Sequence, residues 1–285
     1  MDLETLRGSA SQHDATAGDW FVKSCCLVTM RAGWLKDRDG LGVQKVGSTT
    51  LHTLLAAHPQ LMLPPNKELH FFTLHYVRGE DWYRQQFEAA TSDQRCGEIT
   101  PYYIFHPLVP ERIQLCCPKA RMIVLLRDPV ERALSQVFHS KRLGLETLPL
   151  EEALAAEPER LKHAEENLKR GACHKSHQEH SYMARSQYEL QLQRYEHLFP
   201  RDQLWIGRSE DLFERPERVW RELLQWLELD VIPLPEMGVR ANAGTGATRE
   251  LGDDSRARIR SQLREQLAPT YASMEKKYGL VWNAD

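Results

Sequence analysis

The segment Arg121-Met-Ile-Val-Leu-Leu-Arg-Asp-Pro-Val-Glu-Arg-Ala-Leu-Ser135 joins a short apolar run to a helix-start signal. Residues 122–126 are apolar and flanked by charge, which is typical of a strand buried on both faces of a parallel sheet. Asp128-Pro129 then predicts a helix to about Lys141, because Pro is favoured at the first helical position. Arg127 therefore falls at the carboxyl end of a buried strand, where open α/β sheets bind their ligands.

The chemistry of this segment suits a phosphate. Arg127 carries a guanidinium fork that matches the oxygens of a phosphate dianion. Ser135 lies about two turns into the predicted helix, where its hydroxyl could reach the same anion. The residues alone leave an alternative, in which Arg127 pairs with a neighbouring carboxylate and Ser135 only packs.

Strand and helix signals alternate along the rest of the chain. We expect strands at 27–35, 41–43 and 203–206, with a turn at 37–40, and helices at 48–57, 82–90, 151–170, 182–199, 217–227 and 255–277. This alternation predicts an α/β fold, a P-loop-type doubly wound parallel sheet flanked by helices. We expect a single domain over residues 21–285, preceded by a disordered leader at 1–20.

Composition narrows the function classes. The chain has 285 residues, and 37 Lys and Arg against 40 Asp and Glu give a net charge of −3, without the basic surplus of a nucleic-acid binder. No stretch approaches the roughly 18 apolar residues that span a bilayer, and the polar N-terminus does not resemble a signal peptide. The six cysteines include no CxxC pair. We therefore expect a cytoplasmic protein with reduced thiols and with no membrane or nucleic-acid partner.

The segment Leu41-Gly-Val-Gln-Lys-Val-Gly-Ser-Thr-Thr50 has the features of a phosphate loop between a strand and a helix. Its glycines permit backbone conformations that expose N–H groups, and the N-terminus of the following helix attracts anions. Lys45 precedes the second glycine, whereas the lysine of GxxxxGK[ST] follows it, which argues against ATP or GTP. The alternative is a plain turn with a surface lysine. The predicted phosphate ligands are Lys45, Val46, Gly47, Ser48, Thr49 and Thr50.

These two motifs, in this order, resemble the sulfotransferases that use 3′-phosphoadenosine-5′-phosphosulfate (PAPS), especially the branch of heparan-sulfate sulfotransferases and their bacterial relatives. The first loop is similar to that family's 5′-phosphosulfate loop, and RDPxxRxxS resembles its 3′-phosphate site. Similar segments cover residues 41–282: KExxFF at 67–72, GExSPxY starting at Gly97, GxYxxQLxxW at 186–195, the following FP at 199–200, and EDL at 210–212. Ser186 departs from the pattern, because it stands at a usual glycine position.

The resemblance implies that PAPS is the co-substrate and that its product is 3′-phosphoadenosine-5′-phosphate (PAP). Beyond the first loop, the implied donor contacts are Arg127, Ser135, Tyr188 and Arg249, with Arg240 and Thr245 as further candidates in a late basic loop. No metal is chemically required if Lys45 and helix N–H groups stabilise the leaving phosphate.

Two neighbouring residues compete for the role of general base. Glu68 is the choice by its place in KExxFF, and shielding by Phe71 and Phe72 would raise its pKa. His70 is the rival, because an ordinary imidazole pKa near 6.5 suits the role without tuning. Glu68 could instead be a surface carboxylate paired with Lys67 or Lys45.

The acceptor stays open at this level. A hydroxyl is preferred to an amine, on a small molecule, a sugar, or a β-hydroxyacyl chain on an acyl carrier protein, as in the polyketide-synthase branch of the family. Two other functions remain: a nucleotide-binding regulator without catalysis, and a P-loop kinase-like phosphotransferase. Cys173, His174, His177 and His180 have spacing that resembles a metal cluster, but we interpret them as a loop without metal.

Overall fold

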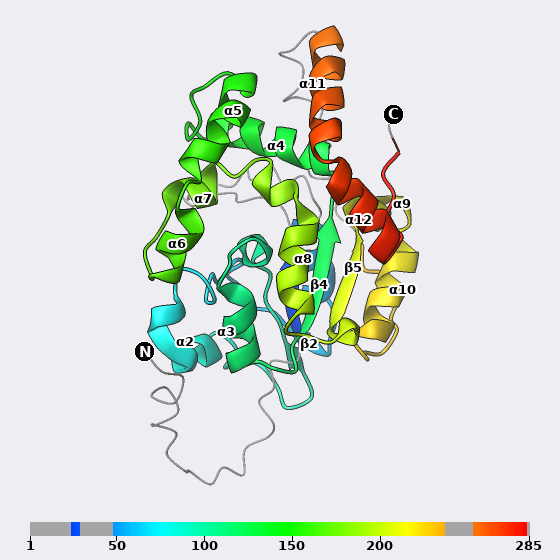
Figure 1. Ribbon diagram of the computed structural model, residues 1–285. Helices are drawn as coiled ribbons and strands as arrows, with labels where there is room; N and C mark the ends of the chain where they lie inside the picture. Colours follow the sequence, from blue (N-terminus) through cyan, green and yellow to red (C-terminus); the bar gives the residue numbers. More distant parts are fainter. Residues whose placement is uncertain (1–23, 29–47, 237–252, 284–285) are drawn as a thin grey trace.

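The computed structural model describes residues 24–28, 48–236 and 253–283 (Figure 1). Within these ranges a parallel sheet has the order β1-β4-β5, formed by Ser24–Val28, Arg121–Leu126 and Leu204–Arg208. The central strand β4 pairs with both neighbours, so that Met122 is aligned with Cys25 on one side and with Leu204 on the other. A smaller parallel pair joins β2, Leu61–Met62, to β3, Arg95–Cys96.

The described helices are α1 Ser48–Ala56, α2 Gly79–Gln85, α3 Val109–Cys116, α4 Pro129–Arg142, α5 Leu150–Arg160, α6 Ala164–Lys169, α7 Lys175–Glu179, α8 Tyr188–Glu196, α9 Ser209–Glu214, α10 Pro216–Trp226, α11 Asp253–Gln266 and α12 Ala268–Tyr278. Short 3₁₀ turns lie at η1 Tyr76–Arg78, η2 Pro101–Ile104, η3 Ala184–Ser186 and η4 Arg201–Gln203. By the criterion of length and apolar character, none of the described helices could cross a membrane.

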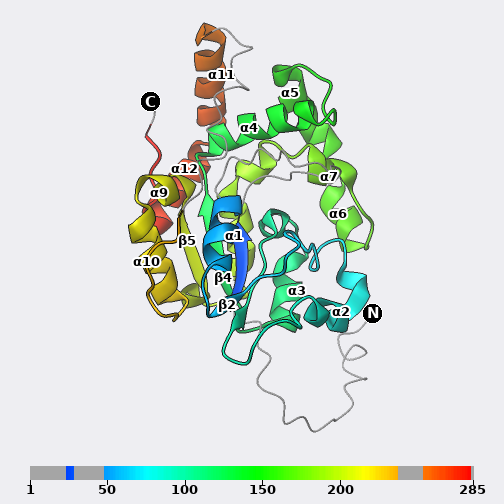
Figure 2. The same cartoon turned by 180° about the vertical axis from the view of Figure 1, so that it is seen from behind.

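Strand β4 lies at the centre of two hydrophobic layers. Met122, Val124 and Leu126 pack into a core with residues of α3, α8 and α12. Ile123 and Leu125 belong to a second core with α1, α9 and α10. Alternate residues of a strand point to opposite faces, so a strand buried on both faces is apolar throughout. Helix α8 covers one face and α1 the other (Figures 1 and 2), which confirms the predicted doubly wound α/β fold.

The elements with the strongest local sequence signals formed as predicted. Helix α4 begins at Pro129, and the Asp128 side chain accepts the backbone N–H of Glu131 as its cap at 2.9 Å. Helix α1 begins at Ser48, as expected, and β5 and α10 lie within two residues of their predicted bounds. These elements carry their start and stop signals within a few residues.

Several boundaries were predicted wrongly. The expected helix 255–277 is divided into α11 and α12, with Pro269 in the first turn of α12, where its missing N–H costs little. The 151–170 helix is interrupted before α6 by His163, whose φ of 60° is left-handed. Residues 182–187 precede α8 rather than belonging to it, and α2 occupies 79–85 instead of 82–90.

The N-terminal predictions are only partly covered. Strand β1 begins at residue 24, three residues before the expected strand at 27–35. The rest of that strand, the turn at 37–40, the strand at 41–43 and the leader at 1–20 lie outside the described residues.

Candidate active site

Arg127 directly follows β4 at the carboxyl edge of the sheet, as predicted, and is partly exposed. The hydroxyl of Tyr188, on α8, donates to the carbonyl oxygen of Arg127 at 2.9 Å. Burial raises the pKa of Tyr188 far above that of an ordinary phenol, so this hydroxyl stays protonated and remains a donor. The structure therefore brings together two residues that the sequence predicted for donor binding, Arg127 and Tyr188.

Ser135 lies in the second turn of α4 and is 8% exposed. Its Oγ has no hydrogen-bond partner within the described part of the chain. Since buried hydroxyls are normally hydrogen-bonded, Ser135 Oγ stays a candidate contact for the predicted phosphate. Arg127 lies just before the start of α4 and Ser135 lies in its second turn, as the predicted phosphate site requires.

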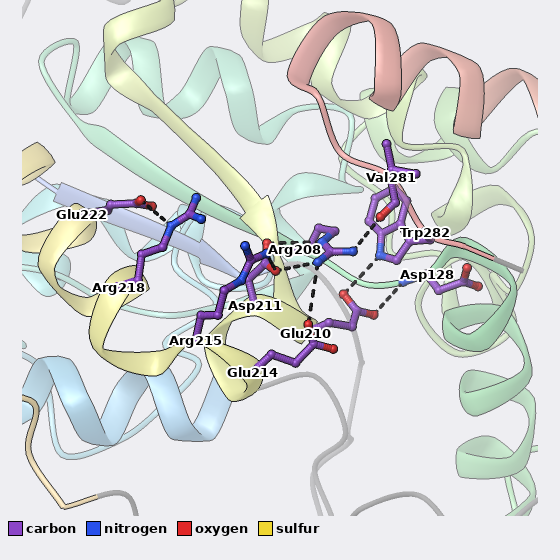
Figure 3. Close-up of polar contacts among 10 residues, drawn as sticks. All are labelled: Asp128, Arg208, Glu210, Asp211, Glu214, Arg215, Arg218, Glu222, Val281 and Trp282. Atoms are coloured by element: carbon purple, nitrogen blue, oxygen red, sulfur yellow. Dashed lines mark hydrogen bonds and ion pairs between the residues drawn. The ribbon is translucent and has the colours of Figure 1, made fainter. Parts of the chain in front are cut away.

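The turn from β4 into α4, residues 127–129, forms a corner of the fold that we call the β4–α4 corner. Glu210, in the first turn of α9, joins this corner to the C-terminal residues (Figure 3). Its Oε1 accepts the backbone N–H of Asp128 at 3.0 Å, and its Oε2 accepts the indole N–H of Trp282 at 3.1 Å. The hydroxyl of Tyr271, on α12, donates to Asp128 Oδ2 at 2.9 Å. The residue after Arg127 is thus held by α9 and α12 together. Glu210 opens the EDL segment at 210–212, and no role was predicted for it.

We expect Glu210→Ala to lower the free energy of unfolding by roughly 1–3 kcal/mol, because it leaves the N–H groups of Asp128 and Trp282 without their acceptor. Glu222→Ala is the control, since the contact described for Glu222 is an exposed ion pair with Arg218, at 2.8 Å on α10 (Figure 3). That control should change stability by no more than about 0.5 kcal/mol. Urea unfolding of both variants measures the difference, and equal effects would contradict the role of Glu210.

Ser186, which departs from the family pattern, is part of the same corner. Arg132, 1% exposed on α4, donates from Nε to Ser186 Oγ at 2.6 Å. Ser186 Oγ in turn donates to the carbonyl oxygen of Pro129 at 2.7 Å. A glycine could make neither bond, so the hydroxyl at this position ties the start of α4 to the segment that leads into α8.

The two candidate bases lie side by side. Glu68 Oε2 is 3.7 Å from His70 Nε2, and the side chains are 18% and 8% exposed. Lys67 Nζ lies 4.0 Å from Glu68 Oε1, at the outer limit of an ion pair, and burial lowers the pKa of Lys67. The other ring nitrogen of His70, Nδ1, lies 3.1 Å from Thr73 Oγ1. This arrangement holds a partly exposed carboxylate against an imidazole, a pair suited to accepting a proton.

Phe71 and Phe72, expected to shield Glu68, belong to the core. The ring of Phe71 stacks on Tyr83, with centroids 4.2 Å apart, and Phe72 meets Tyr83 and Tyr103 edge to face. Both phenylalanines are at most 1% exposed. They anchor the end of the loop that carries the candidate bases.

The histidines at 174–180 have separate partners. His177 Nδ1 lies 2.6 Å from the hydroxyl of Tyr102, and burial lowers the pKa of His177 to about 2. His174 Nδ1 accepts the N–H of His177 as the cap of α7, and His180 Nε2 donates to the carbonyl of Leu145. The loop prediction for this segment was wrong, since 175–179 are helical. No group of three potential ligands for a metal ion occurs among the residues that the structure covers.

Some predicted donor ligands fall where nothing is described. Lys45, Val46, Gly47 and Arg249, with Arg240 and Thr245, lie outside the described residues. Ser48, Thr49 and Thr50 form the first turn of α1, and the side chain of Thr50 is half-buried. Figure 2 shows the start of α1 at the same edge of the sheet as the carboxyl end of β4. The described part of the first loop therefore faces the edge that carries Arg127.

Comparisons with known proteins point the same way. The family profile described as "Sulfotransferase domain" matches residues 41–237. Over 103 residues, 35% of this chain and 22% of the relative, the chain is 41% identical to "Membrane-associated sulfotransferase kil1" of Dictyostelium discoideum. Over 181 residues, 62% of this chain and 48% of the relative, it is 29% identical to mouse "Heparan sulfate glucosamine 3-O-sulfotransferase 5". The chain thus spans less than half the length of either curated relative.

Among solved structures, the chain is similar to a sulfotransferase from Alicyclobacillus acidocaldarius. The TM-score is 0.66 and the sequence identity 25%, over 89% of this chain and 94% of that one. The two chains therefore share their fold over nearly their whole length. Together with a family profile that covers most of the sequence, this shows that the chain belongs to the sulfotransferase domain family.

Proposed function

We propose that this chain transfers the sulfuryl group of PAPS to a hydroxyl acceptor and releases PAP. The acceptor oxygen forms a bond to sulfur as the sulfur–oxygen bond to the 5′-phosphate breaks in line. The electron pair of the broken bond goes to PAP, and the acceptor's proton goes to an enzyme base. The observation that best supports this function is the β4–α4 corner. Arg127 lies between the end of β4 and the start of α4, and Ser135, in the second turn of α4, has a buried hydroxyl without a hydrogen-bond partner among the described residues.

In this proposal Arg127 and Ser135 bind the 3′-phosphate of the donor, and Tyr188 holds Arg127 in place through its carbonyl. The 45–50 loop binds the 5′-phosphosulfate, with backbone N–H groups at the start of α1 directed at its oxygens. Lys45 neutralises the charge that builds on the leaving phosphate, so that no metal ion is needed. Arg249 completes the donor site from the late basic loop.

Glu68 is the proposed general base, with His70 as the second candidate. Glu68 Oε2 and His70 Nε2 are 3.7 Å apart, which is within ion-pair distance but too long for a hydrogen bond, so the imidazole can orient the carboxylate only through its charge. Both act from the same loop, so variants of the two residues distinguish their roles.

The acceptor is proposed as a class. The mouse relative acts, by its name, on heparan sulfate glucosamine, which supports a sugar hydroxyl. A small alcohol and a β-hydroxyacyl chain on an acyl carrier protein are the other proposed acceptors, and we propose that the enzyme works in the cytoplasm.

The test combines donor binding with transfer. Calorimetry with PAP should give a Kd of about 1 µM, equivalent to roughly −8 kcal/mol. ³⁵S-labelled PAPS should then label at least one acceptor from a panel of alcohols, sugars, amines and hydroxyacyl carrier proteins. PAP binding without any transfer would favour a regulator. Tight, magnesium-dependent binding of ATP in place of PAP would favour a phosphotransferase and contradict the proposal.

A further inference from the structure

The loop that carries the two candidate bases has a strained backbone. Glu68 has a φ of 62° and His70 a φ of 51°, both in the left-handed region that residues with a Cβ avoid. Such conformations persist only where surrounding contacts fix them, and they are frequent at functional sites. The contacts that fix this loop therefore bear on catalysis.

Three alternate N–H groups of the loop are bound by one neighbouring segment, residues 99–103. The N–H of Glu68 donates to the carbonyl of Ile99 at 3.2 Å. The N–H of His70 donates to Thr100 Oγ1 at 3.4 Å, and the N–H of Phe72 donates to the hydroxyl of Tyr103 at 3.3 Å. Two of these three acceptors are side-chain hydroxyls, whose lone pairs face the loop only if their protons are directed elsewhere.

Glu98 sets that direction. The Thr100 hydroxyl donates to Glu98 Oε2 at 2.8 Å, and the Tyr103 hydroxyl donates to Glu98 Oε1 at 2.6 Å. All three residues are at most 2% exposed. Burial raises the pKa of Glu98, while these two hydrogen bonds oppose that rise. One buried carboxylate thus orients both hydroxyls so that they accept N–H groups from the strained loop.

We propose that Glu98 is a positioning residue for sulfuryl transfer, which fixes the loop of Glu68 and His70 through the hydroxyls of Thr100 and Tyr103. The proposal rests on the proposed function, since it requires that the base lies in this loop. It also gives a role to the GExSPxY segment, which otherwise has none in the mechanism. Glu98 is only 2% exposed, so in this proposal it acts through the loop and not by contact with the acceptor.

The first test compares two buried tyrosines. Tyr103 and Tyr182 are both 0% exposed, and each donates its hydroxyl to a buried glutamate: Glu98 at 2.6 Å and Glu146 at 2.7 Å. Tyr103→Phe and Tyr182→Phe should therefore lower the Tm by similar amounts. Only Tyr103→Phe releases the base loop, so its kcat should fall about tenfold while the Kd for PAP changes by less than about twofold. Tyr182→Phe should keep kcat within about twofold of the unmodified chain.

The second test uses Thr100, and it can still be carried out if one of the tyrosine variants fails to fold. Thr100→Val keeps the shape but removes the hydroxyl, whereas Thr100→Ser keeps the hydroxyl. Thr100→Val should lower kcat about tenfold with PAP affinity retained, whereas Thr100→Ser should keep most of the kcat of the unmodified chain. Glu98→Gln leaves one hydroxyl proton without an acceptor, so combining it with Tyr103→Phe should lower kcat by less than the product of the two single effects.

Failure of the proposed function and failure of the positioning role of Glu98 give different results. If the unmodified chain neither binds PAP nor transfers sulfate, the proposed function is wrong. If it does both, and Tyr103→Phe and Thr100→Val lower the Tm but leave kcat unchanged, Glu98 serves stability alone and the positioning role is overturned. Glu68→Gln and His70→Ala, measured in the same assay, then show whether the base lies in this loop.

Discussion

Glu68→Gln should lower kcat by about 10²-fold or more, while the Kd for PAP stays the same, because the amide keeps the shape of the side chain but cannot accept the acceptor's proton. A loss of this size corresponds to about 2.7 kcal/mol of transition-state stabilisation. The side chain is only 18% exposed and lies 3.7 Å from His70, so glutamine should fit without displacing the loop. Steady-state kinetics at saturating donor, with calorimetry for PAP, measure the two quantities.

His70→Ala is the companion variant. It removes the contact of Nδ1 with Thr73 and the neighbour of Glu68, so we expect a smaller loss of kcat through poorer positioning. If His70→Ala abolishes transfer and Glu68→Gln retains near-full kcat, the base is His70. If both variants remain active when chemistry is rate-limiting, the base lies outside this loop.

Arg127→Ala should weaken PAP binding by about 2–4 kcal/mol, because a charged partner of the 3′-phosphate is removed from the edge of the sheet. The carbonyl of Arg127 is held by Tyr188 and the N–H of Asp128 by Glu210, so the backbone of the corner should keep its place in the variant. Arg127→Lys should recover only part of the affinity, since an ammonium group cannot form the paired hydrogen bonds of a guanidinium.

The matched control for this prediction is Arg218→Ala. Arg218 is 60% exposed on α10 and pairs only with Glu222 among the contacts described for it, so PAP affinity should not change. Calorimetry gives the affinities, and thermal unfolding confirms that both variants are folded. PAP binding that is equally strong in Arg127→Ala and in the unmodified chain would remove Arg127 from the donor site.

The strands and helices that could be predicted carry their sequence signals within a few residues of their own ends. The apolar run 122–126 formed β4, and Asp128-Pro129 started α4 with its side-chain cap in place. The helix at 255–277 was predicted as one because helix-forming residues continue across residue 267, although Pro269 was a usable signal for the second start. The break at His163 has no such signal, since a histidine with a φ of 60° is selected by its surroundings.

The sequence by itself determined the strand–helix unit that presents Arg127, and the residue types suited to a phosphate and to a base. Those properties depend on neighbours within a few positions, such as a cap and the proline beside it. Only the tertiary structure decided which carboxylates support them, the buried Glu98 and the partly buried Glu210. Glu98 reaches the base loop through Thr100, 30 residues beyond His70, and Glu210 joins Asp128 to Trp282 across separations of 82 and 72 residues. Such hydrogen bonds depend on how distant segments pack around β4, and no local pattern of residues specifies that packing.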